Sequence, residues 1–325
     1  MGITMTLTQL NAFVLVARLG SVTAAASALG VSEPAVSQAL SALRQHLGDQ
    51  LITRGAAGMT LTPGGQRLLT TASQIVVLGA EAHAAVRAAQ GAPEQLRVIA
   101  TAPVAEFVLT PLTEAFIRRY AGQVEVSAGV AASGEMAVLV ANRLADVAIG
   151  SDRGLGAGDP ADSPLAVITE PVFRYRLVVV AASDFAGRGN PVGWRWLVDP
   201  SGTDAGSAAG ALLARLGVPD SRISVFPNQT AAWAAAASGE GVAPAVEHLV
   251  ARQVRRGELR HVEFRGCPLD ACWYATLLER QHRSPAASAF RRFLATPEAM
   301  RLIRSPAAGV PPSRFRPPVY VTIWS

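Results

Sequence analysis

Residues 21–48 read SVTAAASALGVSEPAVSQALSALRQHLG, and their pattern indicates the architecture of the N-terminal part of the chain. Gly30 suits the left-handed conformation that ends a helix, and Ser32 suits the N-cap of the next one. The run after Ser32 repeats apolar residues at helical spacing, namely Val36, Leu40, Leu43 and Leu47. The stretch therefore predicts a helix over 22–29, a short turn and a second helix over about 33–47, which is the helix-turn-helix pattern.

Two further elements flank this pair of helices. Apolar residues recur at helical spacing over 7–19, which predicts a preceding helix with Thr6 or Thr8 as its N-cap. On the other side, short strand-like runs at 50–54 and 59–62 are separated by a glycine-bounded turn. They predict a β-hairpin wing.

A long helical pattern follows the wing, opened by Pro63 and continuing from Gln66 to about Gln90. Its apolar positions are Leu68, Leu69, Ile75, Val76, Leu78 and Val86. A helix of this length outside a domain core usually pairs with another, so we expect it to link the domains and to dimerise the chain.

From Leu96 onward, short apolar strands alternate with helical patterns. Strands are predicted at 96–100, 124–128, 146–149 and near 175, and helices at about 103–120, 134–143, 203–216 and 229–238. This alternation predicts βαβ units around a mixed or parallel sheet.

The composition excludes several kinds of chemistry. The chain has 325 residues and a formal net charge of +5, and its basic residues other than histidine are all arginine. Without lysine there is no Schiff base, P-loop lysine or Ser-Lys dyad. The five histidines are scattered and no nucleophile elbow or dinucleotide fingerprint follows a strand, so we expect no enzyme activity, no cofactor and no metal site.

The two cysteines, Cys267 and Cys272, match neither a redox CxxC motif nor a zinc pattern, and we interpret them as ordinary buried or idle thiols. The N-terminus lacks the features of a secretory signal, and no run of about 18 uncharged apolar residues occurs. We therefore expect a cytoplasmic protein without a membrane partner.

Residues 7–69 resemble the DNA-binding module of LysR-type transcriptional regulators. The resemblance is carried, in order, by the alanine pair of the second helix, Leu29-Gly30-Val31-Ser32, Pro34-Ala35-Val36-Ser37, Leu47-Gly48, Arg54 on the wing and Leu61-Thr62. Several independent elements agree in order and spacing, which a single short motif cannot do.

The resemblance continues over about 96–303, where LysR-type effector domains have two subdomains similar to those of periplasmic binding proteins. Its landmarks are Leu96-Arg97-Val98, Ala100-Thr101, Asp146-Val147-Ala148-Ile149, the glycine-rich turn 239–243 and Ser284-Pro285-Ala286-Ala287, which looks like the start of the last helix. By this resemblance the chain crosses between subdomains near 168–174 and returns near 262–268.

The resemblance implies an all-α winged helix-turn-helix with a long linker helix, followed by a two-subdomain α/β effector domain. The expected boundaries are 1–63 for the DNA-binding domain, 64–92 for the linker helix, 93–303 for the effector domain (subdomain I about 93–168 and 268–303, subdomain II about 169–267) and 304–325 for a Pro-rich tail. The implied partners are double-stranded DNA, a small-molecule effector that an anion would suit, and a second copy or three further copies of the chain.

Three features depart from the family pattern. Glu33 stands where an uncharged residue is common, the wing tip 55–58 lacks extra basic residues, and the chain extends beyond Ile303. Residues 1–62 also carry only three arginines against two carboxylates, which is a low positive charge for a protein that neutralises phosphates.

The candidate DNA-binding residues follow from the second helix and the wing. We expect an outer helix face formed by Ser37, Gln38, Ser41, Arg44 and Gln45. Gln38 has the amide that pairs with adenine in the major groove, and Pro34 and Ala35 can contact a thymine methyl group. Thr23, Ser32 and Ser37 are interpreted as helix caps and phosphate donors. Arg54 is expected to contact a phosphate or the minor groove, with a salt bridge to Asp49 as the alternative, and Glu33 either accepts from cytosine or repels phosphates.

The candidate effector-binding residues come from the resemblance. Thr101, Ser133 and Thr203 would each place a hydroxyl near a helix N-terminus that faces the cleft, which suits a carboxylate. Asn228 would line the same cleft. The functional alternatives are a solute-binding protein, an enzyme that uses the cleft, and redox sensing through Cys267 and Cys272.

Overall fold

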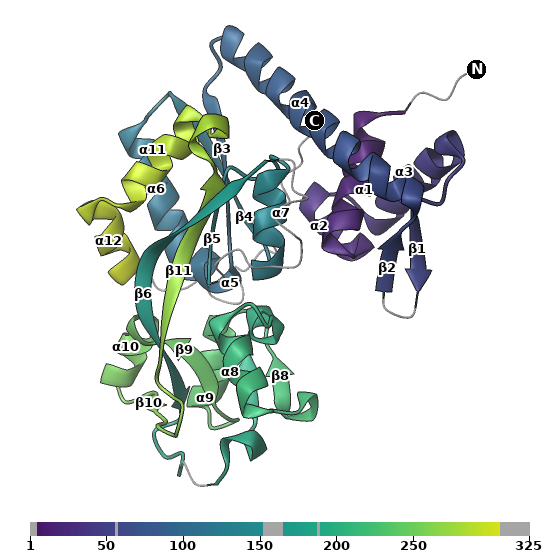
Figure 1. The fold of residues 1–325 in the computed structure, drawn as a ribbon. Helices are drawn as coiled ribbons and strands as arrows, with labels where there is room; N and C mark the ends of the chain where they lie inside the picture. The colour runs from purple at the N-terminus through teal and green to yellow at the C-terminus, as the bar shows by residue number, and fades with distance from the viewer. Residues whose placement is uncertain (1–4, 56–57, 152–164, 187–188, 306–325) are drawn as a thin grey trace.

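The computed structural model describes residues 5–55, 58–151, 165–186 and 189–305 (Figure 1). The predicted wing tip at 56–57 and the Pro-rich tail beyond 305 lie outside these residues. None of the described helices is long and apolar enough to cross a membrane.

The N-terminal unit has the predicted elements. They are α1 (Leu7–Leu19), α2 (Val22–Leu29), α3 (Glu33–Leu47), β1 (Ile52–Gly55) and β2 (Gly58–Leu61), and the two strands pair antiparallel as a wing. Thr6 caps α1 with its side chain, and Ser32 caps α3. Ser21, not Thr23, caps α2, so the interpretation of Thr23 as a cap is wrong.

The helices of this unit pack around a small apolar core. Phe13 and Leu43 are fully buried in it, together with Val36 and Leu40 of the predicted apolar stripe. Leu47 was expected in the same stripe but is 41% exposed, because it is the last residue of α3 before the left-handed Gly48.

A tight corner joins the wing to the next helix. Asp49 accepts hydrogen bonds from the Leu51 amide and the Thr62 hydroxyl, at 2.7 and 2.8 Å, and these bonds lower the pKa of the Asp49 carboxyl. Leu51 has a φ of 58°, which is unusual for a leucine. Its carbonyl oxygen would lie 2.0 Å from a Cβ placed on Gly65, so only glycine fits at position 65.

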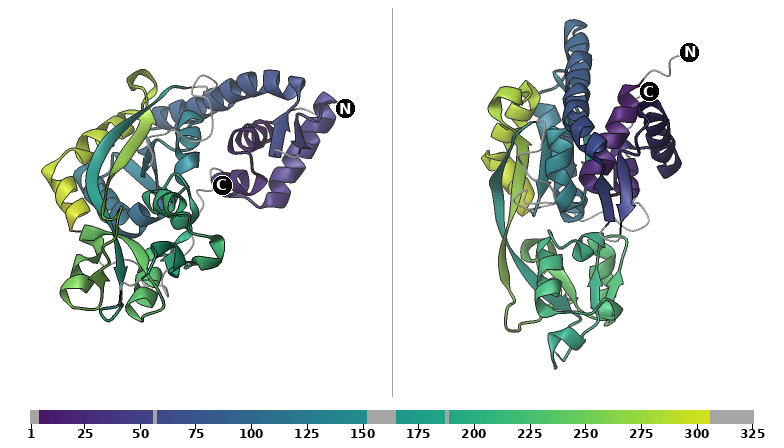
Figure 2. Two further views of the ribbon diagram at one scale, coloured as in Figure 1. Left: turned by 60° about the horizontal axis from the view of Figure 1, so that its bottom comes forward. Right: turned by 45° about the vertical axis from the view of Figure 1, so that its right-hand side comes forward.

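Helix α4 (Pro63–Ala89) begins at this corner and joins the N-terminal unit to the rest of the molecule (Figure 2). Gly79 lets it approach α1, because a Cβ there would meet Leu7 at 3.1 Å. Farther along the helix, Leu78 and Val86 are 62% and 58% exposed. Apolar side chains exposed on a long helix are typical of a surface that pairs with another chain.

The C-terminal region is built on a mixed sheet, as predicted. Its strands are β3 (Glu94–Ala100), β4 (Val124–Val130), β5 (Val147–Gly150), β6 (Val167–Ala181), β9 (Ala243–Val246), β10 (Arg260–His261) and β11 (Leu269–Leu278). Strand β3 pairs parallel with β4 and β5, whereas β11 pairs antiparallel with β5 and β6. Two short strands, β7 (Trp196–Val198) and β8 (Ile223–Val225), pair parallel beside this sheet.

The long strands β6 and β11 pass through both subdomains (Figure 1). Subdomain I contains β3, β4 and β5, and subdomain II contains β9 and β10 paired with the far half of β6. One apolar cluster includes Phe116 of subdomain I and Trp196 of subdomain II. The two subdomains therefore share a continuous core along these strands.

Helices cover the strands of each subdomain. In subdomain I they are α5 (Ala102–Val104), a π-helical segment (Ala105–Leu109), α6 (Thr110–Arg119), a 3-10 turn (Ser133–Glu135), α7 (Met136–Ala141), α11 (Pro285–Leu294) and α12 (Pro297–Arg304). In subdomain II they are α8 (Ala208–Leu216), α9 (Gln229–Ala237) and α10 (Glu247–Arg255), with 3-10 turns at Pro191–Gly193, Pro200–Thr203 and Asp220–Arg222. A further 3-10 turn, Arg280–His282, follows β11.

Three helix expectations need correction. The helix predicted over 103–120 contains a π-helical segment at Ala105–Leu109. The helix predicted from 203 begins at Ala208, where Ser207 supplies the cap, so Thr203 ends a 3-10 turn instead of opening a helix. The helix at 285 is not the last, because the cap of Thr296 starts another one.

Replacing Gly65 with alanine should lower the free energy of unfolding of the N-terminal unit by about 1–3 kcal/mol, because the new methyl group overlaps a backbone carbonyl. Calorimetric melting of the full chain measures this change. Gly193→Ala is the control, since a Cβ at Gly193 meets nothing within 4 Å. Equal effects of the two substitutions would contradict the tight corner.

Candidate DNA interface and effector cleft

The N-terminal half of α3 presents a continuous exposed face. Glu33, Pro34, Ala35, Ser37 and Gln38 are all exposed, whereas the neighbouring Val36 is buried against α1 and α2. Because the buried residue fixes the rotation of the helix, these five side chains point away from the core together. This is the arrangement by which a recognition helix enters the major groove.

The hydroxyl groups around α3 have different surroundings. Ser32 accepts a hydrogen bond from the Ala35 amide at 3.4 Å as the N-cap of α3. Ser37 lies inside α3 and Thr23 lies inside α2, and both are exposed. Ser37 therefore does not act as a cap, but both hydroxyls remain accessible to a phosphate.

Two arginines of this unit have different roles. Arg54 of the wing is exposed and makes no hydrogen bond or ion pair to another described residue. The alternative prediction, a salt bridge between Arg54 and Asp49, is therefore wrong. Arg44 was expected on the outer face of α3, but it is half-buried and donates to the carbonyl oxygens of Gln50 and Ile52 at 2.8 and 3.2 Å. Arg44 holds the wing against α3, whereas Arg54 stays free of polar contacts with the described residues.

Thr101 lies at the end of β3 in subdomain I. It is 2% exposed, and its hydroxyl has no hydrogen-bond partner among the described residues. Its methyl group would lie 2.9 Å from a Cβ at Gly150, so the neighbouring strand accommodates Thr101 only because position 150 is glycine. A buried hydroxyl without a partner is costly unless a ligand or water supplies one.

The other three predicted effector residues lie at the facing turns. Ser133 and Asn228 are each 2% exposed, and the hydroxyl of Ser133 and the side-chain NH2 group of Asn228 lack partners within the described part of the chain. Asn228 also caps α9 by accepting from the Ala231 amide at 2.8 Å. Thr203 is exposed and donates to the Pro200 carbonyl oxygen at 2.8 Å, which leaves it less suited to bind a ligand.

Two carboxylates connect the subdomains across the cleft. Glu106 of subdomain I accepts from the Gln229 and Thr230 amides of subdomain II, both at 3.0 Å. Asp204 of subdomain II accepts from the Ser133 amide of subdomain I, also at 3.0 Å. Sequence reasoning missed both residues, because each bond joins positions far apart in the chain and no local motif marks it.

An aromatic contact accompanies the first of these connections. Phe107 follows Glu106 and stacks on Trp233 of α9, with ring centroids 5.1 Å apart and an angle of 21° between the planes. The indole N–H of Trp233 donates to the Pro244 carbonyl oxygen at 3.0 Å, which holds the ring in place. The start of α9 is thus held by a carboxylate and an aromatic ring of the other subdomain.

Cys267 lies just before β11, and Cys272 lies in the first half of that strand. Burial raises the pKa of the Cys267 thiol, which disfavours the reactive thiolate. Cys272 is half-buried beside an open groove of about 1100 Å³ that also contains Arg174 and His248. Both thiols are free.

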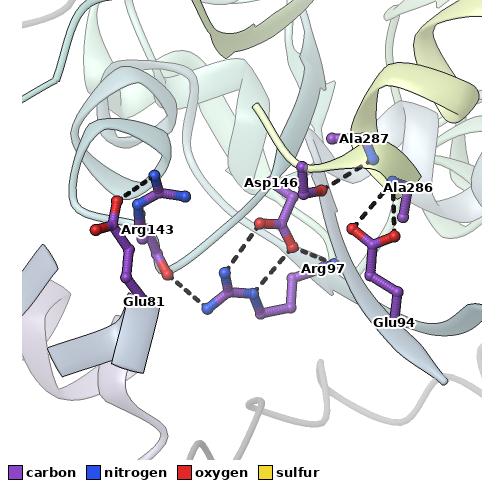
Figure 3. A network of polar contacts seen from close by, with 8 residues as sticks. Glu81, Glu94, Arg97, Arg143, Asp146, Ala286 and Ala287 are labelled. Carbon is purple, nitrogen blue, oxygen red and sulfur yellow. Dashed lines mark hydrogen bonds and ion pairs between the residues drawn. The ribbon is translucent and has the colours of Figure 1, made fainter. Parts of the chain in front are cut away.

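A polar network joins α4 to subdomain I (Figure 3). The Arg97 guanidinium holds the Asp146 carboxylate through two hydrogen bonds of 3.0 and 2.9 Å and also donates to the Arg143 carbonyl oxygen. Arg143 has a φ of 55° and forms an ion pair with Glu81 of α4 at 2.6 Å. A second, more exposed ion pair links Arg87 of α4 to Glu125 at 3.4 Å.

Comparison with known proteins agrees with this architecture. Residues 7–66 match the model of the bacterial regulatory helix-turn-helix protein, lysR family, and residues 89–297 match the LysR substrate binding domain. An uncharacterized HTH-type transcriptional regulator of Mycobacterium tuberculosis is 33% identical over 99% of this chain and 100% of its own length.

Two solved structures share the fold. ArgP from Mycobacterium tuberculosis superposes with a TM-score of 0.51 at 23% identity, covering 88% of this chain and 94% of that one. Full-length LysG from Corynebacterium glutamicum with bound effector Arg has a TM-score of 0.50 at 19% identity, covering 95% of this chain and 100% of that one. With both domain models matched in order along one chain, the protein belongs to the LysR family of transcriptional regulators, with a helix-turn-helix DNA-binding domain and an effector-binding domain.

Proposed function

We propose that this regulator acts in the cytoplasm as a homo-oligomer. It binds double-stranded DNA with the α3 helices and wings of two or more copies of the chain. The exposed face of α3 carries this proposal, because it presents polar and small side chains at the helix N-terminus while Val36, Leu40 and Leu43 of the same helix are packed in the core. Gln38 reads a base, Ser32, Ser37 and Thr23 contact phosphates, and Arg54 contacts the backbone or the minor groove. The exposed Leu78 and Val86 of α4 form part of the contact between copies.

The effector, in this proposal, binds in the cleft between the subdomains without a catalytic step. The support is the group of buried polar atoms at Thr101, Ser133 and Asn228 that have no hydrogen-bond partner among the described residues. Because a ligand shifts an equilibrium only through differential affinity, it must contact the two subdomains differently in the two states of the regulator.

Gln38→Ala should relax the preference at one base position per half-site and weaken specific binding by about 1–3 kcal/mol, because it removes a contact to a base edge.

Arg54→Ala should weaken binding to all DNA sequences equally and reduce the slope of DNA affinity against salt concentration by about one, because it removes a phosphate contact. Footprinting and titrations on the operator, on point-mutated operators and on random DNA separate the two effects. If Gln38→Ala weakened binding to specific and random DNA equally, its assignment to a base would be wrong.

Thr101→Val should abolish the response to effector while DNA affinity without effector stays nearly unchanged. Valine keeps the shape of threonine but removes the hydroxyl, at a loss of about 1–3 kcal/mol in effector binding. Calorimetric titration with the effector, beside a promoter-binding assay, measures both steps. Unchanged effector affinity would remove Thr101 from the site.

Glu81→Gln should reduce the coupling between effector and DNA binding by about 0.5–2 kcal/mol, because it breaks the ion pair that joins α4 to Arg143. The coupling is measured as the change in DNA affinity at saturating effector. Glu125→Gln is the matched control, since the Glu125 side chain is 64% exposed in its ion pair. A larger effect of the control substitution would contradict the route through Arg143.

A further inference from the structure

The cleft of the effector-binding domain brings together carboxylates from both subdomains. Glu106 and Glu135 belong to subdomain I, and Asp199 and Asp204 belong to subdomain II. Within the described ranges, none of the four forms an ion pair with an arginine or a histidine. The cleft therefore holds four carboxyl groups without a paired cation among the described residues, although the chain as a whole is positive.

Glu106 and Asp199 form a first pair of carboxylates, and both accept hydrogen bonds from Gln229. The Gln229 amide N–H donates to Glu106 at 3.0 Å, and its side-chain NH2 group donates to Asp199 at 3.4 Å. One residue thus touches a carboxylate of each subdomain. Burial raises the pKa of both carboxyls, and their mutual repulsion raises that of Glu106 further, against the hydrogen bonds that lower it.

Glu135 and Asp204 form a second pair, and they accept hydrogen bonds from two consecutive backbone amides of subdomain I. The Ala132 amide donates to Glu135 at 3.2 Å, and the Ser133 amide donates to Asp204 at 3.0 Å. Burial again raises the pKa of Glu135, and Asp204 adds to this effect. Two like charges of opposite subdomains are held side by side, which is unfavourable unless a positive group lies near them.

Polar side chains beside these carboxylates are left without partners. The side-chain carbonyl oxygen of Gln229 belongs to the same amide group that contacts Asp199, and it is buried without a donor in the described structure. The hydroxyl of Ser133 lies next to the amide bonded to Asp204 and also lacks a partner. Gln229 is 6% exposed and Ser133 is 2% exposed. Both oxygens can accept hydrogen bonds from a ligand that carries N–H donors.

We propose that this cleft takes an organic cation, an amine or a guanidinium compound, which lies between the pairs Glu106–Asp199 and Glu135–Asp204. The inference rests on the proposed function, in which the cleft binds the effector. A cation of this kind offsets part of the negative charge of both pairs and donates hydrogen bonds to the oxygens of Gln229 and Ser133.

An anionic effector would find the backbone amides of the cleft already bonded to carboxylates. The amides that an anion would use, at Ser133 and at the start of α9, already donate to Asp204 and Glu106. An anion would have to displace these two carboxylates and would add its own charge to theirs. The protein's own carboxylates therefore occupy the backbone amides that the sequence analysis expected an anionic effector to use.

The test uses the full chain with agmatine as the cation and succinate as the anion. Agmatine should raise the Tm of the wild type, and calorimetry should show that Glu135→Gln and Asp199→Asn each weaken its binding about tenfold or more, because each removes one charge from a pair. Glu240→Gln, a substitution of an exposed glutamate outside the cleft, is the control and should bind agmatine like the wild type.

Three results would overturn the inference: no shift of Tm with agmatine, a shift with succinate alone, or equal agmatine affinity in the cleft variants and the control. The variants must keep the circular dichroism spectrum of the wild type, and Glu135→Gln is the milder of the two because its carbonyl oxygen can still accept from Ala132. Binding to operator DNA without ligand is measured on the same samples. Its absence in the wild type would contradict the proposed function, whereas the agmatine results judge only the chemistry of the cleft.

Discussion

The contact between Glu106 and the start of α9 is the interaction on which the arrangement of the two subdomains depends. The first amides of a helix have no partner within the helix, so Gln229 and Thr230 rely on an acceptor from outside. Glu106 supplies it from the other subdomain, and the positive end of the helix favours its charge. The Phe107–Trp233 stack reinforces the same contact with apolar area. Any ligand that changes the angle between the subdomains must alter this contact.

The same domain is tied to the linker helix on its other side. Arg143 joins the turn before β5 to Glu81, and Arg97 holds that turn through its bonds to Asp146 and the Arg143 carbonyl oxygen. The Asp146 carboxylate also accepts from the Arg97 amide at 2.8 Å, so the network includes the backbone of β3. Thr101, at the end of that strand, lies at the cleft. Strand β3 thus connects Thr101 with the joint to α4, and under the proposed function it links the effector to the DNA-binding unit.

The sequence predicted the N-terminal unit almost residue by residue, because its signals are local. Ser32 caps α3, Gly30 and Gly48 end helices, and apolar spacing sets the buried faces of α1 and α3. The errors are also local in origin: Ser21 competes with Thr23 for the same cap, and Arg44 is drawn inward by two carbonyl oxygens of the wing. The cleft was harder to predict, since Glu106 and Gln229 are 123 positions apart and their contact exists only after both subdomains have folded. Buried carboxylates without cations violate the usual sequence rules, and such violations are expected at functional sites.

Amide hydrogen exchange of the free protein tests the cross-cleft contact most directly. We expect the Gln229 and Thr230 amides to be protected in the wild type and to lose protection in Glu106→Ala, because no other acceptor reaches them in the described structure. The Ala231 amide should stay protected in both proteins, since it donates to the side chain of Asn228 within the same helix start. Equal exchange of the Gln229 and Thr230 amides in the wild type and in Glu106→Ala would mean that Glu106 does not hold the start of α9.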